Sequence, residues 1–296
     1  MKSLAILVSS LMISVSYGSF KIKTEHNISE LQVRKVENAK YIDVVLVNFR
    51  GSGLEWREFK KTIKKTIKHY KDAGINLNII KSVELRLEKR FWNLLVNDLV
   101  GIDPSFDIPP YIASRQRGNR INKETEEIFT AMSSLVPNSE NTIFISVHRN
   151  LSYKSWYTRR GERVLFNKGI KGFSFPPYAL GENLPRPIRG FTAILPDVIA
   201  KTISHELGHK LINVSHEGKS ACPHFDGAGI PGLMGYSRSS TIYSGREGRF
   251  HKERLHLSPF VYSIKNGVRV QNDDYEEGGH YRDPIYDGLF LTPECP

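Results

Sequence analysis

The sequence HELGHKLINVSH at residues 205–216 is preceded by the apolar run FTAILPDVIAKTI at residues 191–203. In an α-helix, residues four apart lie on one face, so His205 and His209 can direct imidazole nitrogens at a single metal ion. Glu206 then lies beside that ion rather than on it. Imidazole suits Zn²⁺, which in catalytic sites has three protein ligands and keeps one position for water. This stretch therefore predicts a zinc-binding helix with a carboxylate next to the metal.

The residues around the motif support a buried helix at this place. Apolar side chains occupy its other sides at Leu207, Leu211 and Ile212, and we expect the buried pattern to extend upstream through Val198, Ile199 and Ile203. Pro196 or Asp197 can begin the helix. Asn213 can end it, because asparagine tolerates the left-handed conformation at a helix terminus. A chance HExxH match would not be expected to have this context.

The first residues of the chain predict export. Lys2 supplies a positive start, residues 4–15 form a short apolar run, and SYG at residues 16–18 offers small residues for cleavage. The run is too short to span a bilayer, and we expect no membrane span elsewhere. Residues 1–18 are therefore interpreted as a signal peptide, and the protein is expected to be secreted or periplasmic.

The chain has 296 residues, of which 40% are hydrophobic and 25% charged, and a formal net charge of +11. It is long enough to bury a core as one large domain or as two lobes. Part of the positive charge lies on one expected helix, at Lys60, Lys61, Lys64, Lys65, Lys68 and Lys71. These lysines form either a solvated helix face or a polyanion-binding surface. No aromatic residues alternate with them, so we expect no nucleic-acid partner.

Two cysteines, Cys222 and Cys295, are present. In an oxidising compartment they could form one disulfide closing a long loop, and two independent buried thiols are the alternative. There is no CxxC pair, so the sequence contains no cysteine-built zinc site.

Hydrophobic periodicity predicts the order of the first elements. Residues 19–40 are polar and are interpreted as an N-terminal arm. The run YIDVVLVNF at 41–49 predicts a buried strand, 54–73 have helical spacing, and alternation at 75–79 predicts a second strand that residues 83–87 could extend. This order predicts a βαβ unit in a sheet with helices packed on it.

The remaining expected elements lead to the zinc motif and beyond it. They are a helix at 91–101, a loop at 102–121, a helix capped by Asn122, a strand at 142–147, short extended pieces at 164–166 and 172–175, a strand at 191–195, Gly- and Ser-rich chain at 217–250 and a helix at 255–265. The loop-rich stretch 148–190 either lines a substrate cleft or forms plain surface loops. The two interpretations predict the same composition.

HELGH followed by His216, and then PGLMGY with Met234, resembles the metzincin clan of zinc metallopeptidases, whose signature is HExxHxxGxxH and a later methionine turn. The resemblance covers roughly residues 41–265. It implies an α+β fold, zincin-like, with a twisted mixed sheet, packed helices and an active-site helix. It implies one catalytic domain over residues 41–296, with an N-terminal lobe to about 216 and a smaller irregular lobe at 217–296.

The same resemblance implies an activity. The protein would be a zinc-dependent endopeptidase that hydrolyses peptide bonds with a zinc-activated water and Glu206 as general base. His205, His209 and His216 would be the metal ligands. The substrate would be a protein or peptide, and we expect a monomer. Met234 would lie beneath the histidines, while Tyr236 would either ligate zinc, steady the transition state or simply pack in the core.

The sequence departs from the clan pattern at the third ligand. Six residues separate His209 from His216, where the clan has five, and Asn213 stands where the clan has glycine. An extra helical residue turns the chain by about 100°, so His224 and Asp226 compete with His216. We favour His216, because it is nearer and zinc prefers nitrogen in such sites.

Two other interpretations remain open. A zinc peptidase of another clan would use a distant carboxylate, such as Glu247 or Glu253, as its third ligand. A noncatalytic zinc-stabilised extracellular protein would bind an acidic polymer through the lysine face. Glu206 separates the last case from the enzymes, because a structural zinc site closed by four ligands has no use for an unliganded carboxylate.

Overall fold

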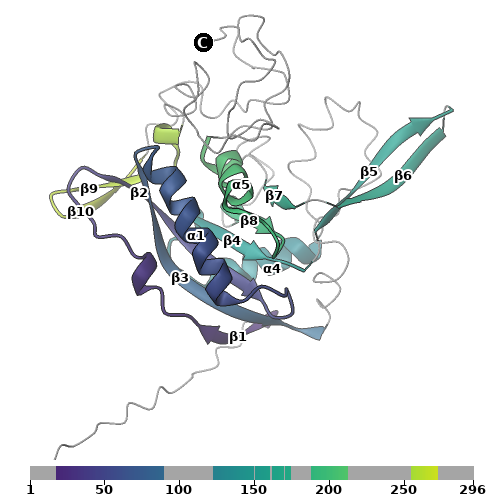
Figure 1. The fold of residues 1–296 in the computed structure, drawn as a ribbon, viewed down its shortest axis with the longest axis horizontal. Helices are drawn as coiled ribbons and strands as arrows, with labels where there is room; N and C mark the ends of the chain where they lie inside the picture. The colour runs from purple at the N-terminus through teal and green to yellow at the C-terminus, as the bar shows by residue number, and fades with distance from the viewer. Residues whose placement is uncertain are drawn as a thin grey trace, which may run out of the picture.

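The computed structural model describes residues 18–89, 123–149, 151–160, 162–169, 171–174, 188–212 and 255–272. Its main element is an eight-stranded mixed sheet with helices on both faces (Figure 1). The predicted α+β class, with a mixed sheet and packed helices, is therefore confirmed. No helix in these ranges is both long and apolar enough to cross a membrane.

The sheet has the strand order β1-β3-β2-β4-β8-β7, with β9 joined to the start of β2 and β10 joined to β9. The strands are β1 (Phe20–Glu25), β2 (Lys40–Phe49), β3 (Ile75–Leu87), β4 (Thr142–Val147), β7 (Gly172–Ser174), β8 (Phe191–Ile194), β9 (Tyr262–Lys265) and β10 (Val268–Gln271). The central strands β3, β2, β4 and β8 are parallel. The strands β1 and β7 run antiparallel at the two edges.

The predicted βαβ unit is confirmed as β2, α1 (Trp56–Lys71) and β3. The helix buries Phe59, Ile63, Thr66 and Tyr70, which lie three or four residues apart and so share one face. Gly74 follows with φ 78°, a left-handed conformation that suits glycine after a helix. On the opposite face, Lys60 and Lys64 pair with Glu30 and Lys61 pairs with Glu58. This partial neutralisation is typical of a solvated face.

A β-bulge explains why the apolar alternation of β3 changes phase. The register with β2 shifts between Val44 and Val45, which leaves Ile80 as the extra residue. Before the bulge, Ile75, Leu77 and Ile79 pack against one core cluster; after it, Val83, Leu85 and Leu87 pack against the other. One inserted residue thus lets a single strand serve both faces of the sheet.

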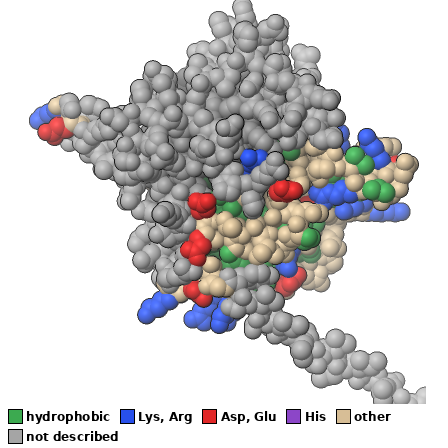
Figure 2. Space-filling model, turned by 180° about the vertical axis from the view of Figure 1, so that it is seen from behind, with side chains coloured by type: hydrophobic (Ala, Val, Ile, Leu, Met, Phe, Trp, Pro, Cys, Tyr) green, Lys and Arg blue, Asp and Glu red, His purple; other side chains and the backbone are tan. Residues whose placement is uncertain are grey.

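The two faces of the sheet carry separate cores. Helices α1 and α5 (Ala200–Ile212) cover one face, and α4 (Lys123–Ser133) covers the other (Figure 1). On the α4 side, Phe129 and Phe144 both stack on Phe191, with ring centroids 4.4 and 4.3 Å apart. Figure 2, viewed from behind Figure 1, shows basic side chains mainly toward the edges of the described surface and acidic side chains scattered around an area of hydrophobic and other side chains.

The predicted helix at 255–265 is wrong over its second half, which forms β9. Asn266 and Gly267 have φ of 54° and 73° and connect β9 to β10 as a two-residue hairpin turn. An Asn-Gly pair is well suited to such a turn, because both positions require positive φ. The hairpin is anchored where Lys40 and Tyr41 of β2 pair with β9.

A second hairpin stands apart from the main sheet. Its strands β5 (Ser152–Arg159) and β6 (Glu162–Gly169) pair only with each other and project from the body of the molecule (Figure 1). The sequence predicted extended chain at 164–166 but missed β5. The stretch predicted as an N-terminal arm, 19–40, begins with β1, which forms an edge of the sheet.

Candidate metal centre

Helix α5 holds the two predicted histidine ligands on one face. The rings of His205 and His209 have their centroids 4.8 Å apart and are inclined at 82°. His209 is 4% exposed, and His205 is partly exposed. Leu207, Leu211 and Ile212 are fully buried in the core beneath the helix, as predicted. Two imidazoles one turn apart on a well-anchored helix are a donor pair that fits zinc.

The carboxylate of Glu206 lies against the edge strand β7. Glu206 is 7% exposed, and a Cβ built at Gly172 would be 2.5 Å from its Oε1 and 2.6 Å from its Cγ. Any side chain at position 172 would therefore displace the carboxylate. Burial raises the pKa of Glu206 to about 8, against an opposing effect of the Lys210 charge. A cation held by the neighbouring histidines would oppose this effect and favour the ionised carboxylate, the form that can accept a proton.

Lys210 lies one turn beyond Glu206 and is also buried, at 2% exposure. Burial lowers the pKa of its ammonium group to about 7, and the charge of Glu206 opposes this change. A buried lysine four residues from a buried glutamate gives each group an opposite charge within one helical turn.

Helix α1 binds the other side of α5. The Tyr70 hydroxyl donates a hydrogen bond of 2.7 Å to the carbonyl of Ser204, and His69 Nδ1 shares a hydrogen bond of 2.7 Å with Ser204 Oγ. Thr66 Oγ1 lies 3.4 Å from the carbonyl of Ala200. Ser204 directly precedes His205, so these contacts act on the turn that carries the motif.

Sequence reasoning missed Gly172, Ser204, Tyr70, His69 and Lys210. For Tyr70 the available signal was a phenol on the buried face of α1. For Gly172 it was a glycine in a predicted strand, which often marks close approach of another group to the backbone. Neither signal identifies its partner.

One upstream prediction is wrong. Ile199 is 63% exposed, although it was expected to extend the buried pattern of the helix. It precedes the first residue of α5, so its side chain does not follow the helical period. Val198 is partly buried against the core, and Ile203 is fully buried, as expected.

The other predicted site residues lie outside the described residues. They are the third-ligand candidates His216, His224 and Asp226, the distant Glu247 and Glu253, Met234 and Tyr236 of the methionine turn, Asn213, Asn122 and the cysteines Cys222 and Cys295. Within the part of the chain that the structure describes, no group of three His, Cys, Asp or Glu side chains could hold a metal ion.

No family model matches the chain, and no curated protein matches it. Among solved structures, the crystal structure of metalloproteinase-II from Bacteroides fragilis is similar to it, with 11% sequence identity and a TM-score of 0.37. That similarity covers 76% of this chain and 55% of the metalloproteinase, so the chain spans little more than half of that protein's length.

Proposed function

We propose that this protein is an exported zinc-dependent endopeptidase that acts as a monomer on protein or peptide substrates. One observation carries the proposal. Two imidazoles lie one turn apart on a buried helix, with rings 4.8 Å apart, and a nearly buried carboxylate lies between them in sequence. A structural zinc site has no need of that carboxylate.

Three residues of α5, His205, Glu206 and His209, have roles in the proposed reaction. His205 and His209 hold zinc, which when bound supplies a Lewis acid and lowers the pKa of a water molecule. Glu206 accepts the proton of the attacking water and later donates it to the departing amine. The backbone of β7 at Gly172 limits where the Glu206 carboxylate can lie.

The test of this function is Glu206→Gln, which deletes the base and keeps the histidines. We expect it to retain about one zinc per chain, the stoichiometry of a single site. It should lower kcat by about 10²- to 10⁴-fold, the range of general-base catalysis. Metal analysis and hydrolysis of a peptide library, read by mass spectrometry, measure both quantities. Glu58→Gln, at an exposed carboxylate on α1, is the control and should match wild type. Undiminished cleavage by Glu206→Gln would refute the mechanism.

We propose His216 as the third zinc ligand and the metzincin clan as the family. The interval from Asn213 to His216 matches the clan's interval from its glycine turn to its third histidine. His216→Ala should weaken zinc binding by at least about 100-fold, because loss of a ligand costs more than the 10- to 100-fold loss caused by removing a hydrogen-bond partner of a ligand. His224→Ala and Asp226→Ala are the controls and should bind zinc as wild type does. Competition with a chelating dye measures the zinc affinity of each variant. If His224→Ala or Asp226→Ala weakened zinc binding and His216→Ala did not, the third ligand would lie elsewhere than His216 and the clan assignment would be wrong.

A further inference from the structure

Two neighbouring turns of α1 bind two neighbouring turns of α5. Tyr70 of α1 donates a hydrogen bond to the carbonyl of Ser204. Thr66, four residues earlier, has its hydroxyl 3.2 Å from the Thr62 carbonyl of its own helix and 3.4 Å from the carbonyl of Ala200, four residues before Ser204. Because residues four apart share a helix face, the two helices meet along matched rows. The small residues in the α5 row allow the helices to approach closely.

These contacts are buried and directional. Thr66, Tyr70 and Ser204 are fully buried. Tyr70 donates to a helix carbonyl, and Ser204 Oγ shares its own hydrogen bond with His69. Ser204 is therefore bound through both its main chain and its side chain. Apolar packing alone would allow small rotations of α5 about its axis, whereas two hydrogen bonds to one residue oppose such a rotation.

Small rotations of α5 matter to a metal site. An atom about 5 to 6 Å from a helix axis moves by about 1 Å when the helix rotates by about 10°. Ligand distances in metal sites are held within about 0.2 Å. His205 and His209 follow Ser204 by one and five residues, so fixing the rotation at Ser204 also fixes the direction of both imidazoles.

We propose that Tyr70 is a positioning residue for the metal helix, acting with the His69–Ser204 pair to set the rotation of α5 and hence the direction of His205 and His209. This inference rests on the proposed zinc site. It does not depend on peptide cleavage, because its consequence is metal affinity and coordination geometry.

The test compares Tyr70→Phe with Tyr41→Phe in the mature protein. Each change deletes one hydroxyl from a buried tyrosine, but the Tyr41 hydroxyl accepts a hydrogen bond of 2.6 Å from the Val36 amide, far along the chain from α5. We expect similar losses of stability in urea unfolding. We expect Tyr70→Phe to raise the zinc Kd about tenfold, as loss of an outer-shell partner does, and Tyr41→Phe to leave it within about twofold, since it touches no residue of α5. The visible absorption of the Co²⁺-substituted protein should change only for Tyr70→Phe.

Equal zinc Kd values and equal Co²⁺ spectra for the two variants would overturn the inference. If Tyr70→Phe does not fold, Ser204→Ala tests the inference instead. This variant removes the hydrogen bond with His69 and leaves Tyr70 in place. A wild-type zinc Kd for Ser204→Ala would then overturn it. A wild type that binds zinc but cleaves no peptide would refute the proposed function alone. A wild type without zinc would refute both.

Discussion

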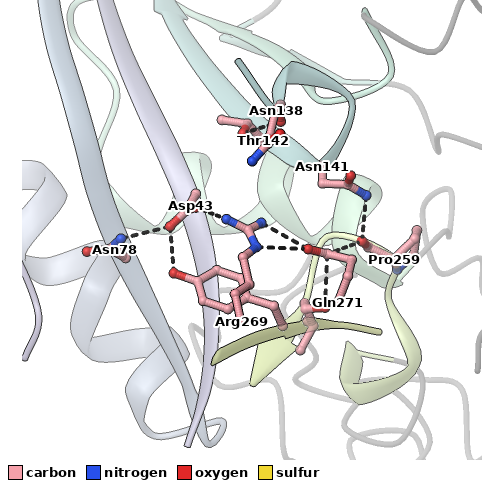
Figure 3. A network of polar contacts seen from close by, with 10 residues as sticks. Asp43, Asn78, Asn138, Asn141, Thr142, Pro259, Arg269 and Gln271 are labelled. Atoms are coloured by element: carbon pink, nitrogen blue, oxygen red, sulfur yellow. Dashed lines mark hydrogen bonds and ion pairs between the residues drawn. The ribbon is translucent and has the colours of Figure 1, made fainter. Parts of the chain in front are cut away.

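The two halves of the sheet differ in the hydrogen bonding of their buried polar side chains. Where β9 and β10 cover the start of β2, Asp43 is 5% exposed and fully partnered (Figure 3). It accepts hydrogen bonds from Asn78 Nδ2 and the Tyr262 hydroxyl, both 2.7 Å, and from Arg269 Nη1, 2.5 Å. The Arg269 guanidinium also lies 3.9 Å from the centroid of the Tyr262 ring.

In the other half, where β4, β8 and β7 lie near α5, buried polar atoms lack partners. His148 Nδ1, Thr192 Oγ1 and Ser174 Oγ are buried without a hydrogen bond. In the described ranges only one other buried side-chain atom is unpaired, Nε2 of His26, which follows β1 and stacks on Trp56 at the start of α1.

The two halves of the sheet therefore contribute differently to stability. An unpaired buried polar group costs about 1 to 3 kcal/mol, so a protein selected only for stability would pair it. Such exceptions are expected near functional sites. The Asp43 cluster therefore ties the β9–β10 hairpin to β2 and β3, whereas each unpaired atom in the other half lowers the stability of the fold.

The strongest test of this comparison is Asp43→Ala, which leaves Asn78, Tyr262 and Arg269 without their acceptor. We expect a loss of about 3 kcal/mol in the free energy of unfolding, because it breaks a largely buried ion pair, and an unchanged zinc Kd. Urea unfolding and dye competition measure the two. Asp43→Asn keeps one acceptor oxygen and should lose less. Zinc binding that weakens together with stability would show that the two halves are not independent.

Gly172→Ala tests the side of the comparison next to α5. The added Cβ would meet Glu206 at 2.5 Å, so the carboxylate must move by about 1 Å. Such a displacement can lower kcat/KM about 100-fold, or about 2.7 kcal/mol, while zinc content stays at the wild-type level. Gly169→Ala is the control, since nothing lies within 4 Å of its added Cβ. Equal peptidase rates for the two variants would show that Gly172 does not position the Glu206 carboxylate.

The pH dependence of the free energy of unfolding tests the cost of burying His148. Burial lowers the pKa of His148 from 6.5 to about 3, so the folded protein keeps it neutral while the unfolded chain takes up a proton below pH 6.5. Stability is therefore lost as pH falls from about 6.5 toward 3.

The matching variant is His148→Gln, which cannot titrate. Between pH 7 and 5, urea unfolding of the wild type should lose about 2 kcal/mol more than the variant does. Parallel pH profiles for the two proteins would contradict a neutral buried imidazole at this position.

The elements with strong periodicity could be predicted from the sequence. The βαβ unit followed from the apolar run of β2 and the helical spacing of Phe59, Ile63 and Tyr70, because local periodicity directly encodes which face is buried. The same logic failed for β9. There Asn266-Gly267 signalled a hairpin, and the apolar residues before it could fit a strand or a helix.

At the site, the sequence alone determined that His205, Glu206 and His209 lie on one helix at a spacing suited to one metal ion, because helix geometry is local. Only the tertiary structure decided that Gly172 of β7 borders Glu206 and that Tyr70 of α1 binds the carbonyl of Ser204. Position 172 is 34 residues from Glu206 in sequence, and Tyr70 is 134 from Ser204. Contacts at such separations depend on strand order and helix packing, which no local pattern in the chain specifies.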